Sequence, residues 1–161
     1  MPLLSRLAGL GDEQRPVTRE AVEQARAAGH LHPLSNLMIH AGLGLVAAAE
    51  GDARAAAVSY DVLGSQTQTV LLVATTSADR LLGLMAATRG DTDAAAEHFE
   101  RALEFCRASG YRPECAWTAH EYVLHLAPEH GPALVEEARG IAHELGMTAL
   151  LSYLPEREAA G

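Results

Sequence analysis

The amino-acid sequence predicts an all-α protein built from consecutive pairs of antiparallel helices. Three observations support this class. Hydrophobic residues make up 48% of the 161-residue chain but aromatic residues only 4%, and alanine, the strongest helix former, is abundant. Apolar residues recur with the helical period in most of the chain. A glycine-centred turn also returns at a nearly constant interval, which is typical of a repeat protein.

The recurring turn joins stretches that are rich in alanine and leucine. Gly51-Asp52 and Gly90-Asp91 lie 39 residues apart, and a weaker copy of the turn, ending at Gly131, follows about 40 residues later. The side chain of an aspartate at a helix start can accept a backbone N–H that has no partner within the helix. Asp52 and Asp91 are therefore predicted to be N-caps, and each turn is predicted to connect the two helices of a hairpin.

The remaining elements follow from the same signals. In chain order, the apolar period predicts helices at 17–28, 34–50, 52–63, 76–89, 91–109, 113–126 and 130–145, with a short one at 147–153. Glycine is common just after a helix, and it is predicted to end three of these at Gly64, Gly110 and Gly146. The stretch 66–76 is rich in threonine and valine, so it is predicted to be an extended connector.

Small and large residues alternate between the two helices of a predicted hairpin. Gly83 and Phe99 have this relation in the second hairpin, and Gly44 and Tyr60 have it in the first. We expect the glycine to mark the helix crossing and the aromatic ring to fill the gap towards the next helix. One hairpin alone cannot bury its apolar face, so about three must stack to form a continuous core.

The stretch from Asp79 to Tyr153 resembles tetratricopeptide arrays of large bacterial signalling proteins, namely transcription regulators of the LuxR and maltose-regulator kind and multidomain nucleotide cyclases. The resemblance rests on Arg80–Leu84, Gly90-Asp91, Ala96–Leu103, Gly110–Pro113, Glu121-Tyr122, Val135–Ala138 and Ala142–Met147. It implies a tetratricopeptide-like α-α superhelix, a helical-hairpin solenoid of about three repeats with capping helices. In that family the array is a regulatory or partner-binding module beside a catalytic or DNA-binding domain.

On this basis we expect a single domain over residues 1–161. Its predicted parts are an N-terminal cap (1–33), repeat 1 (34–65), the extended connector (66–76), repeat 2 (77–110), a degenerate repeat 3 (111–146), and a C-terminal cap with its tail (147–161).

Charge and composition limit the function. The net charge is −9 and every basic side chain is an arginine, so a basic stripe for phosphate backbones is missing and neither nucleic acid nor an anionic membrane surface is an expected partner. The first residues lack the apolar segment of a signal peptide, and the longest apolar run, 70–74, is too short to span a bilayer. We therefore expect a cytoplasmic protein.

No catalytic or cofactor motif is assembled in the sequence. Gly42-Leu43-Gly44 lies inside a predicted helix, whereas a dinucleotide motif requires a preceding strand. The serines lack the context of a nucleophile elbow. We therefore predict no enzymatic activity and no cofactor.

Metal binding is the one chemical alternative that the sequence leaves open. Potential ligands gather in the third repeat at Cys115, His120, Glu121, His125, His130 and His143. Only Glu121 and His125 share a helix face at i,i+4 spacing, and neither HExxH nor CxxC occurs. The prediction is no metal site.

The function expected from this organisation is a non-enzymatic, regulatory protein-interaction module. In paired-helix solenoids the first helix of each pair lines the inner groove. The residues predicted to line this groove are Met38, Leu45, Arg80, Leu84, Thr88, Trp117, His120 and Leu124. Because this lining is mostly apolar, the expected partner is a helix or peptide, or a second copy of the chain.

Three alternatives stay open at this point. The groove residues near Arg80, Trp117 and His120 could form a small-ligand or metal sensor. The chain could be the separated regulatory tail of a larger signalling protein. The terminal helix or the 66–76 connector could fill the groove instead of a partner.

Overall fold

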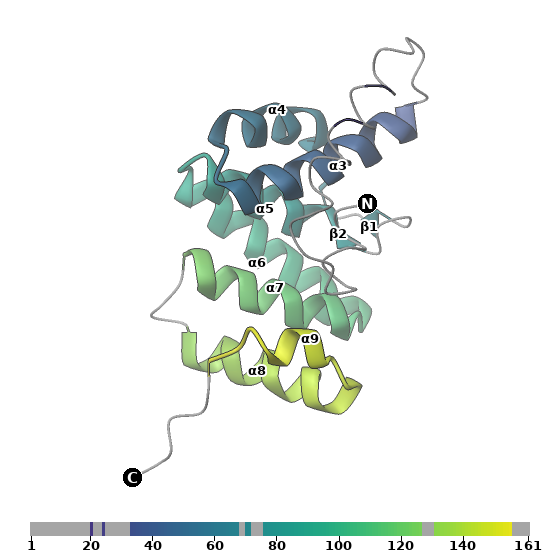
Figure 1. Ribbon diagram of the computed structural model, residues 1–161. Helices are drawn as coiled ribbons and strands as arrows, with labels where there is room; N and C mark the ends of the chain where they lie inside the picture. The colour runs from purple at the N-terminus through teal and green to yellow at the C-terminus, as the bar shows by residue number, and fades with distance from the viewer. Residues whose placement is uncertain are drawn as a thin grey trace.

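The chain folds into a layered stack of helices (Figure 1). The structure, a computed structural model, describes residues 20, 24, 33–67, 70–71, 76–126 and 131–155. The elements in these residues are α3 (Pro33–Glu50), α4 (Ala53–Leu63), β1 (Val70–Leu71), β2 (Thr76–Ser77), α5 (Ala78–Thr88), α6 (Thr92–Ser109), α7 (Arg112–His125), α8 (Gly131–Leu145) and α9 (Thr148–Leu151). The predicted all-α class is confirmed for this part of the chain.

Consecutive helices pack as hairpins, and the hairpins pack on one another. The pairs α3/α4, α5/α6 and α7/α8 each form an extensive contact, and α4 and α6 each contact the hairpin that follows. The first helices also contact each other directly, α3 against α5 and α5 against α7, and α9 packs on α8. Figure 1 shows the resulting order from α3 and α4 at one end of the stack to α8 and α9 at the other.

The helix positions predicted from the sequence agree with the structure. From residue 34 onward each expected helix is present, and its ends lie within two residues of the expected ones. The helix expected at 17–28 lies outside the described residues apart from Glu20 and Gln24. None of the helices in the described ranges is both long enough and apolar enough to cross a membrane.

Both predicted N-caps are confirmed. The Asp52 carboxylate accepts the backbone N–H of Ala55 at 3.0 Å, and the Asp91 carboxylate accepts that of Ala94 at 3.2 Å. Each bond satisfies one of the N–H groups that the first turn of a helix leaves without a partner. The second helix of each of the first two hairpins therefore begins directly after the aspartate that follows the turn glycine.

Four of the turn glycines have left-handed backbone angles. Gly51 and Gly90 have φ values of 68° and 84°, and Gly110 and Gly146 are also left-handed. Gly64 ends α4 as expected, but it does so with a right-handed φ of −57°. The third turn, at 128–131, lies outside the described residues except for Gly131, which is the first residue of α8.

The connector between the first two hairpins is extended at residues 70–71 and 76, whereas Thr67 lies in a turn. β1 and β2 form an antiparallel pair in which Val70 lies opposite Ser77 and Leu71 opposite Thr76. Because Thr76 and Ser77 belong to this pair, α5 begins at Ala78, two residues later than expected. The pair brings Thr76 and Ser77 against α7, where both are fully buried.

Glycines allow close helix contacts in the core, although the two hairpins use them differently. A Cβ atom on Gly83 would lie 3.0 Å from the ring of Phe99, in the partner helix of the same hairpin, as predicted. The Phe99 ring stacks on Tyr122 of the next hairpin with centroids 5.5 Å apart. Gly44 instead packs against Met85 of the following hairpin, which would lie 2.0 Å from a Cβ atom there. The nearest neighbour of Gly44 is therefore in the following hairpin, across the contact between α3 and α5.

Candidate functional site

The residues predicted to line the groove are mostly buried. Leu45, Arg80, Leu84, Trp117 and His120 are all below a tenth exposed, whereas Met38 and Thr88 are half-buried and Leu124 is 62% exposed. The Thr88 hydroxyl donates to the Leu84 carbonyl oxygen within its own helix. An incoming partner on this face would therefore meet Leu124 and parts of Met38 and Thr88, while the other five residues make contacts within the chain.

Arg80 lies at the centre of a buried ion network that joins α5, α7 and β2. Its Nε donates to Glu114 Oε1 at 2.7 Å and its Nη1 to Glu121 Oε2 at 2.9 Å. Its Nη2 donates to the Thr76 hydroxyl at 2.7 Å. Glu114 Oε1 also accepts from the Thr76 hydroxyl and from the backbone N–H of Ser77, at 2.7 Å and 2.6 Å. One guanidinium thus holds two hairpins and the connector together.

Local sequence explains how α7 supplies both acidic partners. Glu114 and Glu121 are seven residues apart, which places them on the same side of the helix, two turns from each other. Burial by itself lowers the pKa of an arginine, but the negative charges of Glu114 and Glu121 outweigh that effect and hold the pKa of Arg80 above its ordinary value. Arg80 therefore stays charged, and removing either kind of partner would leave an uncompensated charge in the interior.

Trp117 and His120 belong to an aromatic cluster with the C-terminal segment. The rings of Trp117 and His120 lie 6.2 Å apart, and Tyr153, just after α9, lies 6.1 Å from the first and 6.2 Å from the second. Tyr153 itself is 55% exposed. At this end of the stack, the segment after α9 covers two of the residues predicted to face a partner.

A second polar cluster joins the first two hairpins. His98 Nδ1 lies 2.9 Å from Asp79 Oδ1 and 2.8 Å from Arg101 Nη2, and its Nε2 lies 2.8 Å from the Tyr60 hydroxyl. The Arg89 guanidinium stacks on the Tyr60 ring at 3.8 Å. Asp79 and His98 are buried, so this cluster connects α4, α5 and α6 within the interior. Tyr60 thus bridges to the next hairpin, as Phe99 does, but through polar contacts.

The two cysteines are buried thiols with weak nucleophilic character. Burial raises the pKa of Cys106 to about 12, with the charge of Glu114 adding to the effect. Burial also raises the pKa of Cys115 to about 11, together with the charge of Glu137, whose carboxylate lies 3.6 Å from its sulfur. The thiolate is the reactive form of cysteine, so a raised pKa makes both residues unreactive near neutral pH.

The ligands of the metal alternative do not gather into one cluster within the described ranges. His120 is buried beside Trp117, whereas His125 and His143 are exposed, and His130 lies outside the described residues. Among the residues that the structure describes, no three or more histidine, cysteine or acidic side chains come together in a way that could hold a metal ion.

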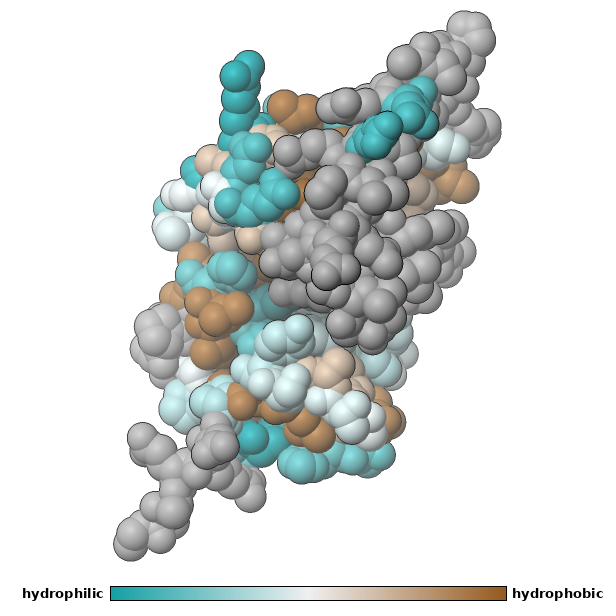
Figure 2. Space-filling view, in the orientation of Figure 1, coloured by the Kyte–Doolittle hydropathy of each residue, from teal (hydrophilic) through white to brown (hydrophobic). Residues whose placement is uncertain are grey.

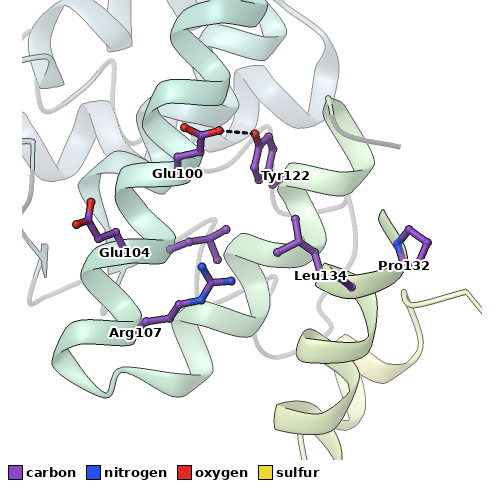
Figure 3. Close-up of a pocket in the computed structure, with 8 residues that line it drawn as sticks. Glu100, Glu104, Arg107, Tyr122, Pro132 and Leu134 are labelled. Carbon is purple, nitrogen blue, oxygen red and sulfur yellow. Dashed lines mark hydrogen bonds between the residues drawn. The ribbon is translucent and has the colours of Figure 1, made fainter. Parts of the chain in front are cut away.

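A surface cavity of about 550 Å³ lies where the second and third hairpins meet, on the side of α6 and α8. Its apolar lining consists of Leu103, Tyr122, Pro132, Ala133 and Leu134, and its polar lining of Glu100, Glu104 and Arg107. Figure 3 shows the acidic residues and Arg107 on α6, with Leu134 and Pro132 across from them on α8. The volume falls within the ordinary range of ligand-binding cavities.

One hydrogen bond and one ion pair connect the helices around this cavity. The Tyr122 hydroxyl donates to Glu100 Oε1 at 3.1 Å, drawn as the dashed line in Figure 3. Arg107 forms a two-point ion pair with Glu137 on α8, through Nε at 3.0 Å and Nη2 at 2.5 Å. Hydrogen bonding to Arg107 holds the pKa of the Glu137 carboxyl below its ordinary value. Both connections fix α6 against the third hairpin.

Sequence reasoning missed the partners of Arg80 and the whole cavity. One signal was present, because Arg80 is the only basic residue in the mostly apolar helix 78–88, and a buried arginine requires carboxylates. The seven-residue spacing of Glu114 and Glu121 could have identified these two residues as the partners of Arg80. No comparable signal marks the cavity, because its lining comes from three helices of two hairpins.

Comparison with known proteins adds no relative. No protein-family model matches the chain, no curated protein does, and no solved structure does. The function is therefore inferred from the geometry of the chain itself.

Proposed function

We propose that the three hairpins form a tetratricopeptide-like superhelix and that the protein is a non-enzymatic, regulatory interaction module that binds a helix or short peptide of a partner protein. The observation that carries the proposal is the repeated packing of first helices, α3 on α5 and α5 on α7, together with the contact of α4 and α6 with the hairpin that follows each of them. Stacks of this kind present long, fixed surfaces for polypeptide recognition.

The use of the buried charges supports a scaffold rather than a catalytic site. Arg80, Glu114 and Glu121 are engaged with one another, and Asp79 and His98 are engaged in the second cluster. These groups rigidify the junctions between hairpins, which keeps the outer surface in one shape. A preformed surface reduces the conformational cost of binding.

Surface composition is also suited to polypeptide partners. Figure 2 shows hydrophobic side chains in small groups between hydrophilic ones on the described part of the visible face. The exposed large hydrophobic residues of the described ranges are distributed over several helices and the C-terminal segment, at Leu34, Val58, Leu124, Leu145 and Tyr153. Apolar contacts surrounded by polar groups are the usual composition of protein interfaces.

Peptide display on the immobilised protein tests the proposal. We expect selection from a library of short random peptides to enrich a family of related sequences that bind the purified protein in solution with micromolar dissociation constants. Leu124→Asp probes the groove predicted from the sequence, because this leucine is largely exposed and its replacement leaves the core intact. The matched control is Val58→Asp on α4, a similarly exposed position.

Two results would contradict the proposal. Selection could enrich no peptide that binds in solution, or native mass spectrometry of the purified protein could show a stoichiometric metal ion or small molecule. The second result would favour the sensor alternative.

A further inference from the structure

The cavity between α6 and α8 is a feature that the predicted groove does not include. Its apolar lining comes from α6, α7 and α8, so it bridges two hairpins. Leu103 and Tyr122 are buried and form its interior, whereas Glu100, Glu104 and Ala133 are exposed at its edge. An apolar interior open to solvent is the arrangement that accepts a hydrophobic side chain from another molecule.

The edge of the cavity has a net negative charge. Glu100 and Glu104 are exposed and lie one turn apart on α6. Among the residues that the structure describes, Glu104 has no ion-pair partner. Glu100 accepts the hydrogen bond from the Tyr122 hydroxyl that Figure 3 draws as a dashed line. The nearby positive charge of Arg107 is offset by its two-point ion pair with Glu137. A cationic group on the ligand is therefore favoured, and a carboxylate is disfavoured.

The two edge glutamates form a row along α6. Glu100 and Glu104 run along α6 at i,i+4 spacing, which corresponds to a rise of about 6 Å. A partner helix that lies along this row presents neighbouring side chains one turn apart, so it can offer an apolar residue to the cavity and a basic residue to the acidic edge.

We propose that this cavity binds one apolar side chain of a partner helix that carries a lysine or arginine one turn away. The inference rests on the proposed function and names the chemistry of the partner. The Tyr122–Glu100 hydrogen bond and the Arg107–Glu137 ion pair hold the walls in place before the partner arrives. Binding then excludes water chiefly from Pro132, Ala133 and Leu134, since Leu103 and Tyr122 are already buried.

The test uses a designed peptide of known composition. An alanine-based, fluorescein-labelled helical peptide with leucine and lysine four residues apart is titrated against the full chain at low salt and followed by fluorescence anisotropy. A second peptide has glutamate in place of lysine. We expect saturable one-to-one binding of the lysine peptide and at least about tenfold weaker binding of the glutamate peptide.

Two variants locate the binding site. Ala133→Trp fills the cavity from an exposed position and is expected to weaken binding by about tenfold or more. Glu104→Gln removes one negative charge from the edge of the cavity. It is expected to weaken binding by roughly threefold, because an ion pair exposed to solvent contributes little. The matched controls are Ala53→Trp and Asp61→Asn, both exposed on α4, and they are expected to leave binding unchanged.

Several outcomes would overturn the inference. The first is equal binding of the lysine and glutamate peptides, and the second is peptide binding that Ala133→Trp leaves unchanged. The third is self-association of the protein that Ala133→Trp abolishes, since the occupant of the cavity would then be a second copy of the chain. If peptides selected by display bind but lose affinity through Leu124→Asp alone, this inference fails while the proposed function stands. If display yields no binding peptide at all, the proposed function itself fails.

Discussion

Arg80 connects parts of the chain that are far apart in sequence. It bonds to Glu114 and Glu121, which lie 34 and 41 residues further along, and to Thr76 just before its own helix. All four side chains are buried. A buried ion pair adds little stability compared with an apolar replacement, but breaking one is costly because the remaining charge has lost both water and partner.

Replacing Arg80 by alanine is expected to lower the free energy of unfolding by about 3–5 kcal/mol, measured by urea denaturation. Adding Glu114→Gln and Glu121→Gln to this variant should restore part of the loss, since the uncompensated charges are then gone. Arg112→Ala is the matched control, because Arg112 pairs with Glu144 on the surface. Equal effects of Arg80→Ala and Arg112→Ala would contradict the role assigned to Arg80.

Gly83 and Gly140 lie within helices but differ in their surroundings. A Cβ atom on Gly83 would crowd the fully buried Phe99 ring at 3.0 Å, whereas a Cβ atom on Gly140 would meet nothing within 4 Å. Gly83→Ala is therefore expected to destabilise the protein by about 1–2 kcal/mol. Gly140→Ala is expected to stabilise it by about 0.5–1 kcal/mol through the higher helix propensity of alanine. Urea denaturation of the two variants measures both values, and the prediction is wrong if their signs agree.

Helix positions were predictable because their signals are local. An N-cap bond connects residues three positions apart, and a helical period is visible within a few turns. Asp52 and Asp91 were identified from sequence for this reason. The start of α5 was misplaced by two residues because Thr76 and Ser77 pair with β1, and that pairing depends on where the connector folds back.

The Asp52 cap is expected to stabilise α4 through its bond to the Ala55 N–H. Asp52→Ala removes the acceptor and should lower the free energy of unfolding by about 1 kcal/mol. Asp52→Asn keeps an acceptor oxygen and should cost much less. Thermal or urea unfolding followed by circular dichroism measures both. Similar losses for the two variants would show that charge, rather than the hydrogen bond, is responsible.

Ion pairs near the surface also connect the helices of the stack, both between hairpins and within one. Arg107 pairs with Glu137 between α6 and α8, and Arg112 with Glu144 between α7 and α8. These pairs lie near the surface, so each contributes less than the buried network around Arg80. The Arg107–Glu137 pair does, however, make the junction of the second and third hairpins sensitive to the protonation of a carboxylate.

Acid is therefore expected to loosen this junction. Arg107 holds the pKa of Glu137 below its ordinary value of 4.5 in the folded protein. Stabilisation from this group is fully present above about pH 4.5 and is lost as the pH falls through the folded-state pKa, because the unfolded chain binds the proton more readily. Urea midpoints measured between neutral pH and pH 3 should fall, and Glu137→Gln should make this fall shallower. An unchanged slope in the variant would contradict the assignment.

The candidate site was predictable only in part. The side chains expected to line the groove were placed on the first helices, but five of the eight are buried, and Tyr153 covers Trp117 and His120. Helical periodicity tells which face of a helix a residue occupies. It does not tell which other segment covers that face, because this depends on residues far away in the chain.

Composition, the recurrence of Gly-Asp turns and the apolar period were enough to establish an all-α chain of hairpins, since each of these signals acts over a few residues. The partners of Arg80, the contact of Gly44 with Met85 and the cavity between α6 and α8 required the folded arrangement. Each depends on the distance and angle between separate hairpins, and these are set by the combined packing of many side chains.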